Sequence, residues 1–226
     1  MEIGLILFPR LTQLDLTGPF EAFARIPNAN VHLIWKSIEP VVSDTGLRIL
    51  PTITFEDCPD LDVICVPGGP GINALLDDQQ VLAFVRRKGE RARYVTSVCS
   101  GALVLGAAGL LKGYKAATHW ASREFLAPFG AIPVKTRVCI DGNRITGGGV
   151  TAGIDFALHL TAQLTDRKAA ERIQLYMEYN PEPPHQAGSP DTAPPELVAE
   201  FHTRAKGMLE ERRGAVARAA AKLDTE

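Results

Sequence analysis

The residue best placed for chemistry is Cys99, which lies in the stretch 94–106, YVTSVCSGALVLG. The residues before Cys99 are rich in β-branched side chains, which predicts a buried strand, and the small residues and leucines after it predict a closely packed helix. The free N–H groups and positive dipole end of such a helix favour an anion, so we expect a lowered thiol pKa. The sequence thus predicts a nucleophile at a strand-to-helix turn. A buried structural cysteine is the alternative that this local pattern leaves open.

A nucleophilic thiol needs a proton partner and an anion-binding site. Asp15, in QLDLTGPFEAF, is flanked by two leucines. Apolar surroundings raise the pKa of a carboxyl, so Asp15 is the first candidate, although a lone Asp before a helix is also a common helix cap. We expect Glu21, a second acid, to be exposed. Gly68 and Gly69 follow another apolar run, so their N–H groups could approach a ligand, or they could simply form a tight turn.

The other residues with reactive side chains carry weaker signals. His119, in AATHW, follows a short predicted strand, but no Asp or Glu in that motif would orient it as a base. We therefore expect a packed or hydrogen-bonded histidine. Cys58, Cys65 and Cys139 lie in or beside apolar stretches and are expected to be small core residues. Without paired ligand spacing, we expect no metal site.

The elements that must position these residues follow from hydrophobic patterning. Apolar runs predict strands at 3–8, 31–35, 61–66 and 94–98, with shorter strands within 41–55 and at 114–118. Helices are predicted at 15–25, 78–91, 120–127, 151–164 and 166–179, and after Cys99. Residues 132–140 and 144–146 predict a hairpin around the turn pair Asp141 and Gly142. Continuous apolar strands alternating with helices predict a parallel sheet covered on both faces, with ligand sites at the carboxyl ends of the strands.

The chain of 226 residues is long enough for one large domain with a tail. We expect a catalytic domain over 1–180, and a Pro-rich arm with a C-terminal helix over 181–226 that packs on the domain or on a dimer partner. The net charge of −2 argues against a general nucleic-acid binder. The N-terminus lacks the pattern of a signal peptide, and no apolar run is long enough to span a bilayer. We therefore expect a cytoplasmic protein with no membrane partner.

Four stretches together, VCSGALVLGAAGLLKGYKAATHW, PGGPGINALL, LDLTGPFEAF and GGGVTAGIDFALHL, resemble the DJ-1/PfpI superfamily. The resemblance covers essentially the whole chain. Within the superfamily it is closest to the isocyanide hydratases, and there it extends to NPEPPHQAGSPDTAP. It implies a flavodoxin-like α/β three-layer sandwich, with a mostly parallel sheet and helices on both faces. It also implies a homodimer and a nucleophilic cysteine at a strained elbow.

Carried over by motif, the resemblance makes Cys99 the nucleophile and Asp15 its acid partner, where many members have Glu. Ser100 follows the nucleophile, where the relatives usually have Thr. The backbone N–H groups of Gly69 and Ser100 are the implied anion-binding pair. The positions assigned to the pocket or to a supporting role are Gly148, Val150, His119 and Thr17.

The implied activity is that of a cysteine-dependent hydro-lyase, which converts an isocyanide to an N-substituted formamide through a thioimidate on Cys99 and needs no cofactor. PfpI-type peptidases have His directly after the cysteine, so Ser100 argues against a protease. The alternatives are a DJ-1-like glyoxalase or stress protein, and a ligand-sensing domain like the N-terminal domain of AraC-type regulators. The tail is too short for the helix-turn-helix domain that those regulators add. A thiol that only senses peroxide is a further alternative.

Overall fold

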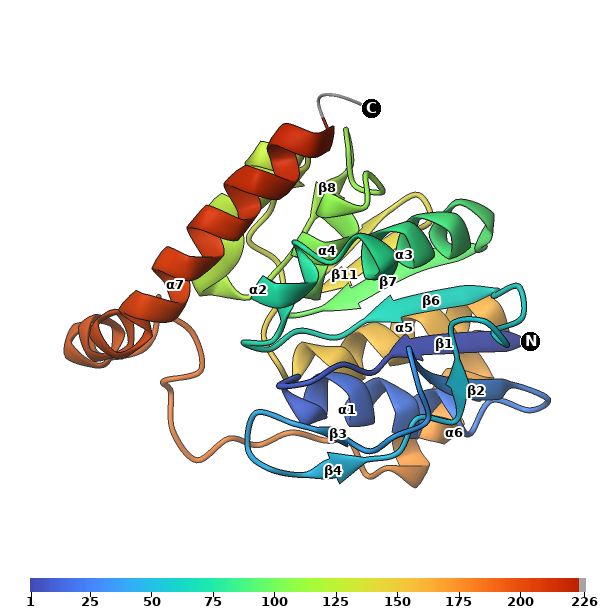
Figure 1. Cartoon of the computed structure of the whole chain (residues 1–226). Helices are drawn as coiled ribbons and strands as arrows, with labels where there is room; N and C mark the ends of the chain where they lie inside the picture. Colours follow the sequence, from blue (N-terminus) through green and yellow to red (C-terminus); the bar gives the residue numbers. More distant parts are fainter. Residues whose placement is uncertain (224–226) are drawn as a thin grey trace.

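A computed structural model describes residues 1–223 and is built around a seven-stranded sheet (Figure 1). The strand order is β10-β11-β7-β6-β1-β2-β5, and every neighbouring pair is parallel except β10 and β11. The strands are β1 (Glu2–Ile6), β2 (Asn30–Trp35), β5 (Ile53–Thr54), β6 (Val63–Val66), β7 (Tyr94–Val98), β10 (Val138–Asp141) and β11 (Arg144–Gly147). The mostly parallel sheet is the one that the alternating pattern predicts.

Helices cover both faces of the sheet, so the α/β three-layer sandwich is confirmed (Figure 1). One layer contains α1 (Gln13–Phe23), α5 (Ala152–Leu164) and α6 (Arg167–Tyr176). The other contains α2 (Ile72–Leu75), α3 (Gln79–Arg91) and α4 (Gly101–Ala107), together with the 3₁₀ helix η1 (Trp120–Phe129) and α7 (Pro195–Leu223). The central strand β6 is buried along its whole length, because a parallel strand covered on both sides must be apolar on both faces.

The structure corrects two of the predicted elements. The predicted helix at 120–127 is a 3₁₀ helix with Pro128 near its end. The predicted hairpin is limited to β10 and β11, because Ile132–Pro133 forms a separate strand, β9, that pairs in parallel with β8 (Lys115–Ala116). Proline has no N–H to donate to a ladder, so Pro133 suits the end of a two-residue strand better than a long hairpin. The region 41–55 holds the predicted short strands, β3 (Val41–Val42), β4 (Arg48–Ile49) and β5.

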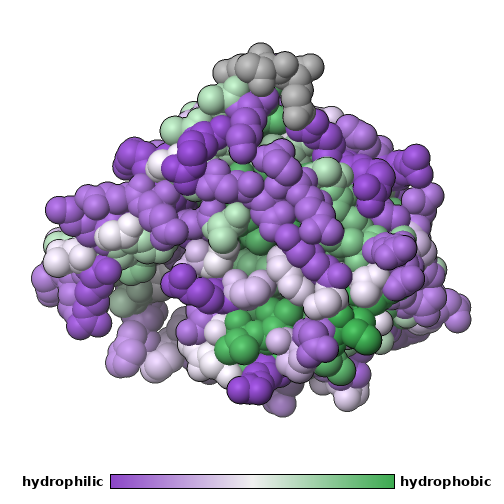
Figure 2. All heavy atoms as spheres, in the orientation of Figure 1, coloured by the Kyte–Doolittle hydropathy of each residue, from purple (hydrophilic) through white to green (hydrophobic). Residues whose placement is uncertain are grey.

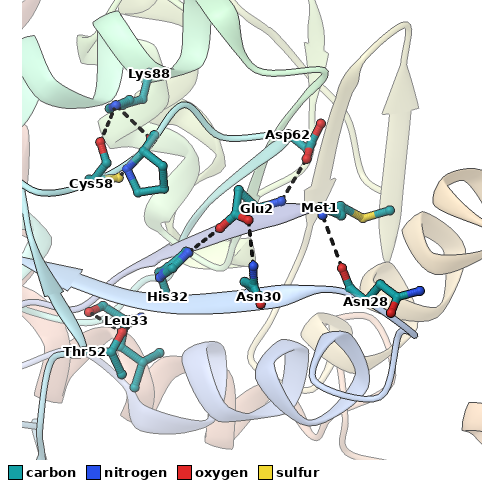
Figure 3. Close-up of polar contacts among 11 residues, drawn as sticks. Met1, Glu2, Asn28, Asn30, His32, Leu33, Thr52, Cys58, Asp62 and Lys88 are labelled. Carbon is teal, nitrogen blue, oxygen red and sulfur yellow. Dashed lines mark hydrogen bonds and ion pairs between the residues drawn. The ribbon is translucent and has the colours of Figure 1, made fainter.

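Side-chain hydrogen bonds fix the N-terminal end of β1 against its neighbours (Figure 3). The backbone N–H of Glu2 donates to Asp62 at 2.8 Å, while the Glu2 carboxylate contacts Nε2 of His32 at 2.6 Å and accepts from Asn30 at 2.7 Å. Lys88, which is buried, donates to the carbonyls of Cys58 and Pro59 at 2.8 Å each. These contacts explain how charged groups are accommodated at this end of the sheet, away from Cys99.

The C-terminal segment returns to the body of the protein. After α6 the chain runs as an arm without regular structure to α7, and α7 packs against α2, α4 and η1 through Arg212, Ala215, Val216 and Ala219. The face shown in Figure 2 is mostly hydrophilic, with apolar side chains gathered where β3 and β4 lie; Val42, Leu47 and Leu50 are exposed there. Within residues 1–223, no helix is both long enough and apolar enough to cross a bilayer.

Candidate active site

Cys99 occupies a strained backbone position between β7 and α4. Its φ of 56° lies in the left-handed region, which costs a residue with a side chain about 1–3 kcal/mol. The surrounding structure holds this conformation: the Cys99 N–H donates to the carbonyl of Gly147 at 3.1 Å, and the Cys99 carbonyl accepts from Thr118 Oγ1 at 2.7 Å. A Cβ at Gly101 would lie 2.0 Å from the carbonyl oxygen of Val66. The elbow therefore depends on glycine where it passes the end of β6.

Asp15, in the first turn of α1, is fully buried beside this elbow. Its Oδ2 accepts from the backbone N–H of Gly68 at 2.9 Å, and its carboxyl interacts with the Cys99 thiol. Burial raises the pKa of Asp15 to about 7, against the lowering effect of the Gly68 N–H. A Cβ at Gly68 would lie 2.5 Å from the Ser100 nitrogen and 2.9 Å from Asp15 Oδ2. A glycine at this strand end is what lets the carboxyl and the elbow meet.

The pKa of Cys99 moves in the opposite direction to the one predicted from the helix start. Cys99 is only 6% exposed, and burial, followed by the negative charge of Asp15, raises its pKa well above the ordinary value. The Ser100 N–H and the charge of Arg212 lower it without cancelling these effects. Two acids that repel each other this closely titrate as a pair. The pair therefore keeps at least one proton at neutral pH. In the form in which Asp15 holds that proton, the repulsion on a Cys99 thiolate disappears.

Ser100 connects the elbow to the loop after β6. The Gly69 N–H donates to Ser100 Oγ at 3.0 Å, and Ser100 Oγ lies 3.3 Å from the Gly69 carbonyl, to which it can donate. The Gly69 N–H is therefore engaged within the protein and does not lie free as half of the predicted anion-binding pair. The Ser100 N–H, the other half, is directed at the Cys99 sulfur. Ser100 thus shapes the nucleophile's surroundings through its hydroxyl as well as its backbone.

Cys99 opens into a cavity of about 150 Å³. Its walls come from the loop before α1, the loop after β6, the elbow at Cys99, η1 and α7. Among the residues that line it are Gly69, Ser100, His119, Val150, Phe201 and Arg212. The cavity is large enough for a small linear group but not for a bulky substrate.

Arg212 is a site residue that the sequence reasoning missed. It is only 4% exposed, and its guanidinium donates to Asn73 Oδ1 at 2.9 Å, to Ser122 Oγ at 2.7 Å and to the Gly69 carbonyl at 3.4 Å. All three partners are neutral, and within residues 1–223 no carboxylate lies within ion-pair distance of it. A buried cation normally needs a counter-charge. A thiolate at Cys99, which lines the same cavity, is the group that can supply one.

The spacing of apolar residues in the C-terminal helix could have identified Arg212 from the sequence. Ala215, Val216 and Ala219 follow it at three, four and seven residues and are buried, which is the spacing of one helix face. An arginine on that apolar face is out of place unless it meets a specific partner.

Removing the charge of Arg212 is expected to make Cys99 harder to ionise. In Arg212→Met, we expect the pH profile of Cys99 alkylation by iodoacetamide to shift upward by about one to three units, the size of effect that a nearby opposite charge has. Arg212→Lys keeps a positive charge and should shift less. Arg213→Met is the matched control, because Arg213 is exposed and pairs with Glu124. A folded Arg212→Met protein with an unchanged profile would contradict the electrostatic role.

Only some of the remaining predicted site residues line the cavity at Cys99. Val150 and His119 line the cavity at Cys99, and Gly148 lies in the wall of a neighbouring cavity. Nδ1 of His119 accepts from the Ala121 N–H at 3.3 Å, and burial together with the charge of Arg212 lowers its pKa to about 4, so it is neutral at pH 7. Thr17 lies in the wall of neither cavity. Its hydroxyl donates to Gln13 within α1 at 2.8 Å, and its supporting role stays a prediction.

The described part of the chain, residues 1–223, contains no group of three or more His, Cys, Asp or Glu side chains arranged to hold a metal ion. We therefore assign no residue as a metal ligand. The polar groups at the site are the thiol, the carboxyl, the hydroxyl of Ser100 and the guanidinium of Arg212.

The fold and this site together define a class: an α/β sandwich with a nucleophile-type cysteine on a strained elbow and a buried carboxyl beside it. The model of the DJ-1/PfpI family matches residues 1–163, and the chain belongs to this family. It is 56% identical to the isonitrile hydratase of Pseudomonas putida over 224 residues, which is 99% of this chain and 98% of that protein.

Two other proteins are similar to this chain, one in structure and one in sequence. A ThiJ/PfpI family protein from Pseudomonas syringae superimposes with a TM-score of 0.93 at 46% identity, covering 95% of this chain and 90% of that one. The HTH-type transcriptional regulator GbdR of Pseudomonas aeruginosa is 30% identical over 82% of this chain, which matches 53% of the regulator. The proteins similar to this chain therefore include both a protein named as an enzyme and a protein named as a regulator, so the site must decide between these functions.

Proposed function

We propose that this protein is an isocyanide hydratase, which adds water to R–N≡C to give the formamide R–NH–CHO. The observation that carries the proposal is the buried Asp15 carboxyl, with its pKa raised to about 7, which interacts with the Cys99 thiol beside a small cavity. The near full-length likeness to an isonitrile hydratase supports the same conclusion, because isonitrile is another name for isocyanide. A sensing domain would have no need for a nucleophile matched to a proton donor of pKa about 7.

In the first step, the Cys99 thiolate attacks the terminal carbon of the isocyanide. A C–S bond forms, and the negative charge that develops on this carbon takes the proton of the Asp15 carboxyl. The products are an Asp15 carboxylate and a thioimidate, Cys99–S–CH=N–R. Since the Asp15 pKa of about 7 lies close to working pH, the carboxyl can give up this proton and later recover one.

In the second step, water adds across the C=N bond of the thioimidate. The Asp15 carboxylate takes a proton from the water as its oxygen bonds to carbon, and that proton passes to the nitrogen. The tetrahedral carbon then loses the thiolate, while the proton of its hydroxyl returns to Asp15. The C–S bond breaks, the formamide leaves, and the starting thiolate and carboxyl are restored. One carboxyl thus serves as acid and then as base.

Arg212 and the Ser100 N–H support both steps by stabilising charge on sulfur, which is the nucleophile in the first step and the leaving group in the second. The neutral His119 lines the cavity without adding a charge that would compete for the thiolate.

We also propose that the protein acts as a cytoplasmic homodimer. The four free cysteines suit a reducing compartment, and the exposed apolar side chains at β3 and β4 suit contact with a second copy.

The test is to mix the protein with an aryl isocyanide, follow formamide by chromatography, and look for an added mass on the peptide containing Cys99. We expect catalytic formamide production with a transient adduct of one substrate mass. Turnover of methylglyoxal with no formamide from any isocyanide would instead select the glyoxalase alternative. Binding of ligands with no turnover of either would select the sensing domain.

A further inference from the structure

A second, larger cavity adjoins the one at Cys99. It has a volume of about 460 Å³ and shares His119 and Val150 with the smaller cavity. Its walls come from η1, the segment before β10, the start of α5 and the arm at 188–191. If the isocyano group occupies the small cavity, the substituent R of the substrate extends past these two shared residues into the large one.

The wall of the large cavity is positively charged. It contains three cationic side chains, Arg123, Lys135 and Arg137, and one carboxylate, Asp191. Two of the three cations are already paired: Lys135 with Asp191, and Arg137 with Asp155, which lies 2.5 Å from its Nη2. His119 is neutral at pH 7 and adds no charge. The net positive charge of the cavity wall therefore comes from Arg123.

Arg123 has no partner among residues 1–223. Its Nε is buried and makes no hydrogen bond, and no carboxylate lies within ion-pair distance of its guanidinium. Its sequence neighbour Glu124 pairs with Arg213 on α7 instead. A buried donor on a charged group costs free energy when it is left unsatisfied. A guanidinium that faces a cavity in this state is suited to an anionic ligand group, which it can bind through two parallel N–H donors.

We propose, building on the hydratase function above, that the preferred substrates are isocyanides whose substituent carries a carboxylate, and that Arg123 binds this carboxylate. The small cavity holds the isocyano end at Cys99, and the large cavity holds the charged end. The hydroxyl of Thr136, which also lines the large cavity, is a further donor. Thr151 accepts from Arg137 and keeps its own O–H to donate, whereas the Ser189 hydroxyl lies 3.1 Å from that of Thr192. Arg123 on this account sets substrate specificity and takes no part in the bond changes at Cys99.

The test compares ω-isocyanoalkanoates of increasing chain length with their methyl esters. We expect one chain length at which the carboxylate has a kcat/KM about tenfold or more above its ester, the effect of one charge-assisted hydrogen bond. In Arg123→Gln the carboxylate should lose that advantage, mainly through a higher KM, while the ester changes little. Arg213→Gln, which removes an exposed and paired cation, is the matched control. Equal values for carboxylate and ester in the wild type would overturn the proposal, as would an equal loss for both in Arg123→Gln.

A binding measurement separates this proposal from the proposed function. The formamide products, ω-formamidoalkanoates, are titrated calorimetrically into wild type and Arg123→Gln, with the corresponding primary amides as neutral probes. Binding of the carboxylates that Arg123→Gln weakens supports the anion site even if no isocyanide is hydrated, in which case only the hydratase function fails. Hydration of neutral isocyanides, with no preference for carboxylates in either assay, sinks the anion site and leaves the hydratase function intact.

Discussion

Cys99→Ala is expected to abolish formamide production completely. Every step proposed here passes through a bond between substrate carbon and the Cys99 sulfur, and no other described cysteine lines the cavity. The variant should also form no covalent adduct when mixed with an isocyanide. Cys99 already holds its left-handed φ with a Cβ in place, and alanine removes only the sulfur, so we expect the loss to report the chemistry and not a new backbone. The measurement is formamide formation under single-turnover conditions with excess enzyme, which detects even one slow cycle.

Cys58→Ala is the control for this prediction. Cys58 is buried and free like Cys99, but it lies beside the loop that Lys88 holds and not at the cavity. We expect its activity to match that of the wild type. If Cys99→Ala still produced formamide, the thioimidate route would be wrong, and direct attack of water activated by Asp15 would replace it.

Asp15→Asn is expected to lower kcat by about 10²- to 10⁴-fold, the usual contribution of general acid–base catalysis. The amide can still accept from the Gly68 N–H, so the elbow contact survives, but it has no proton to give to the substrate carbon. In the wild type, the rate should rise as pH rises through about 7, because the pair of Asp15 and Cys99 then loses the first of its two protons and reaches the one-proton state in which a carboxyl can stand beside a thiolate. Asp15→Asn should lose this inflection. Glu21→Gln is the matched control, since Glu21 is an exposed acid on the same helix.

The same substitution should make the protein more stable at high pH. Burial raises the pKa of Asp15 from 3.8 to about 7, so the folded state binds its proton more tightly than the unfolded chain does. The stabilisation from this proton is complete below the unfolded pKa and is lost as pH rises through about 7. Above that pH a buried carboxylate costs on the order of a few kcal/mol, and asparagine avoids this cost. Urea unfolding at pH 5 and pH 8 measures it: Asp15→Asn should unfold at higher urea at pH 8, and an equal or lower midpoint would show that Asp15 is ionised without cost.

Local patterns in the sequence determined the scaffold. The β-branched run before Cys99 and the small residues after it predicted the junction of β7 and α4, because strand and helix periodicity depend on neighbouring residues. The apolar runs that form β1 and β6 predicted a sheet buried on both faces for the same reason. Asp15 between two leucines predicted a carboxyl with a raised pKa, and the structure agrees. Where local signals conflicted, as in the proline-containing stretches of η1 and β9, the predicted elements were wrong.

Only the tertiary structure decided the electrostatics of the site. Arg212 lies 143 residues from Gly69 in the chain, yet it donates to the Gly69 carbonyl and lines the cavity at Cys99. No periodicity in the neighbourhood of Cys99 could reveal a cation brought there by the last helix. The direction of the Cys99 pKa shift was likewise beyond local reasoning, because burial and the charge of Asp15 outweigh the N–H groups of the elbow. A pKa depends on every charge and on all the solvent excluded around a group, and both are known only once distant segments have packed together.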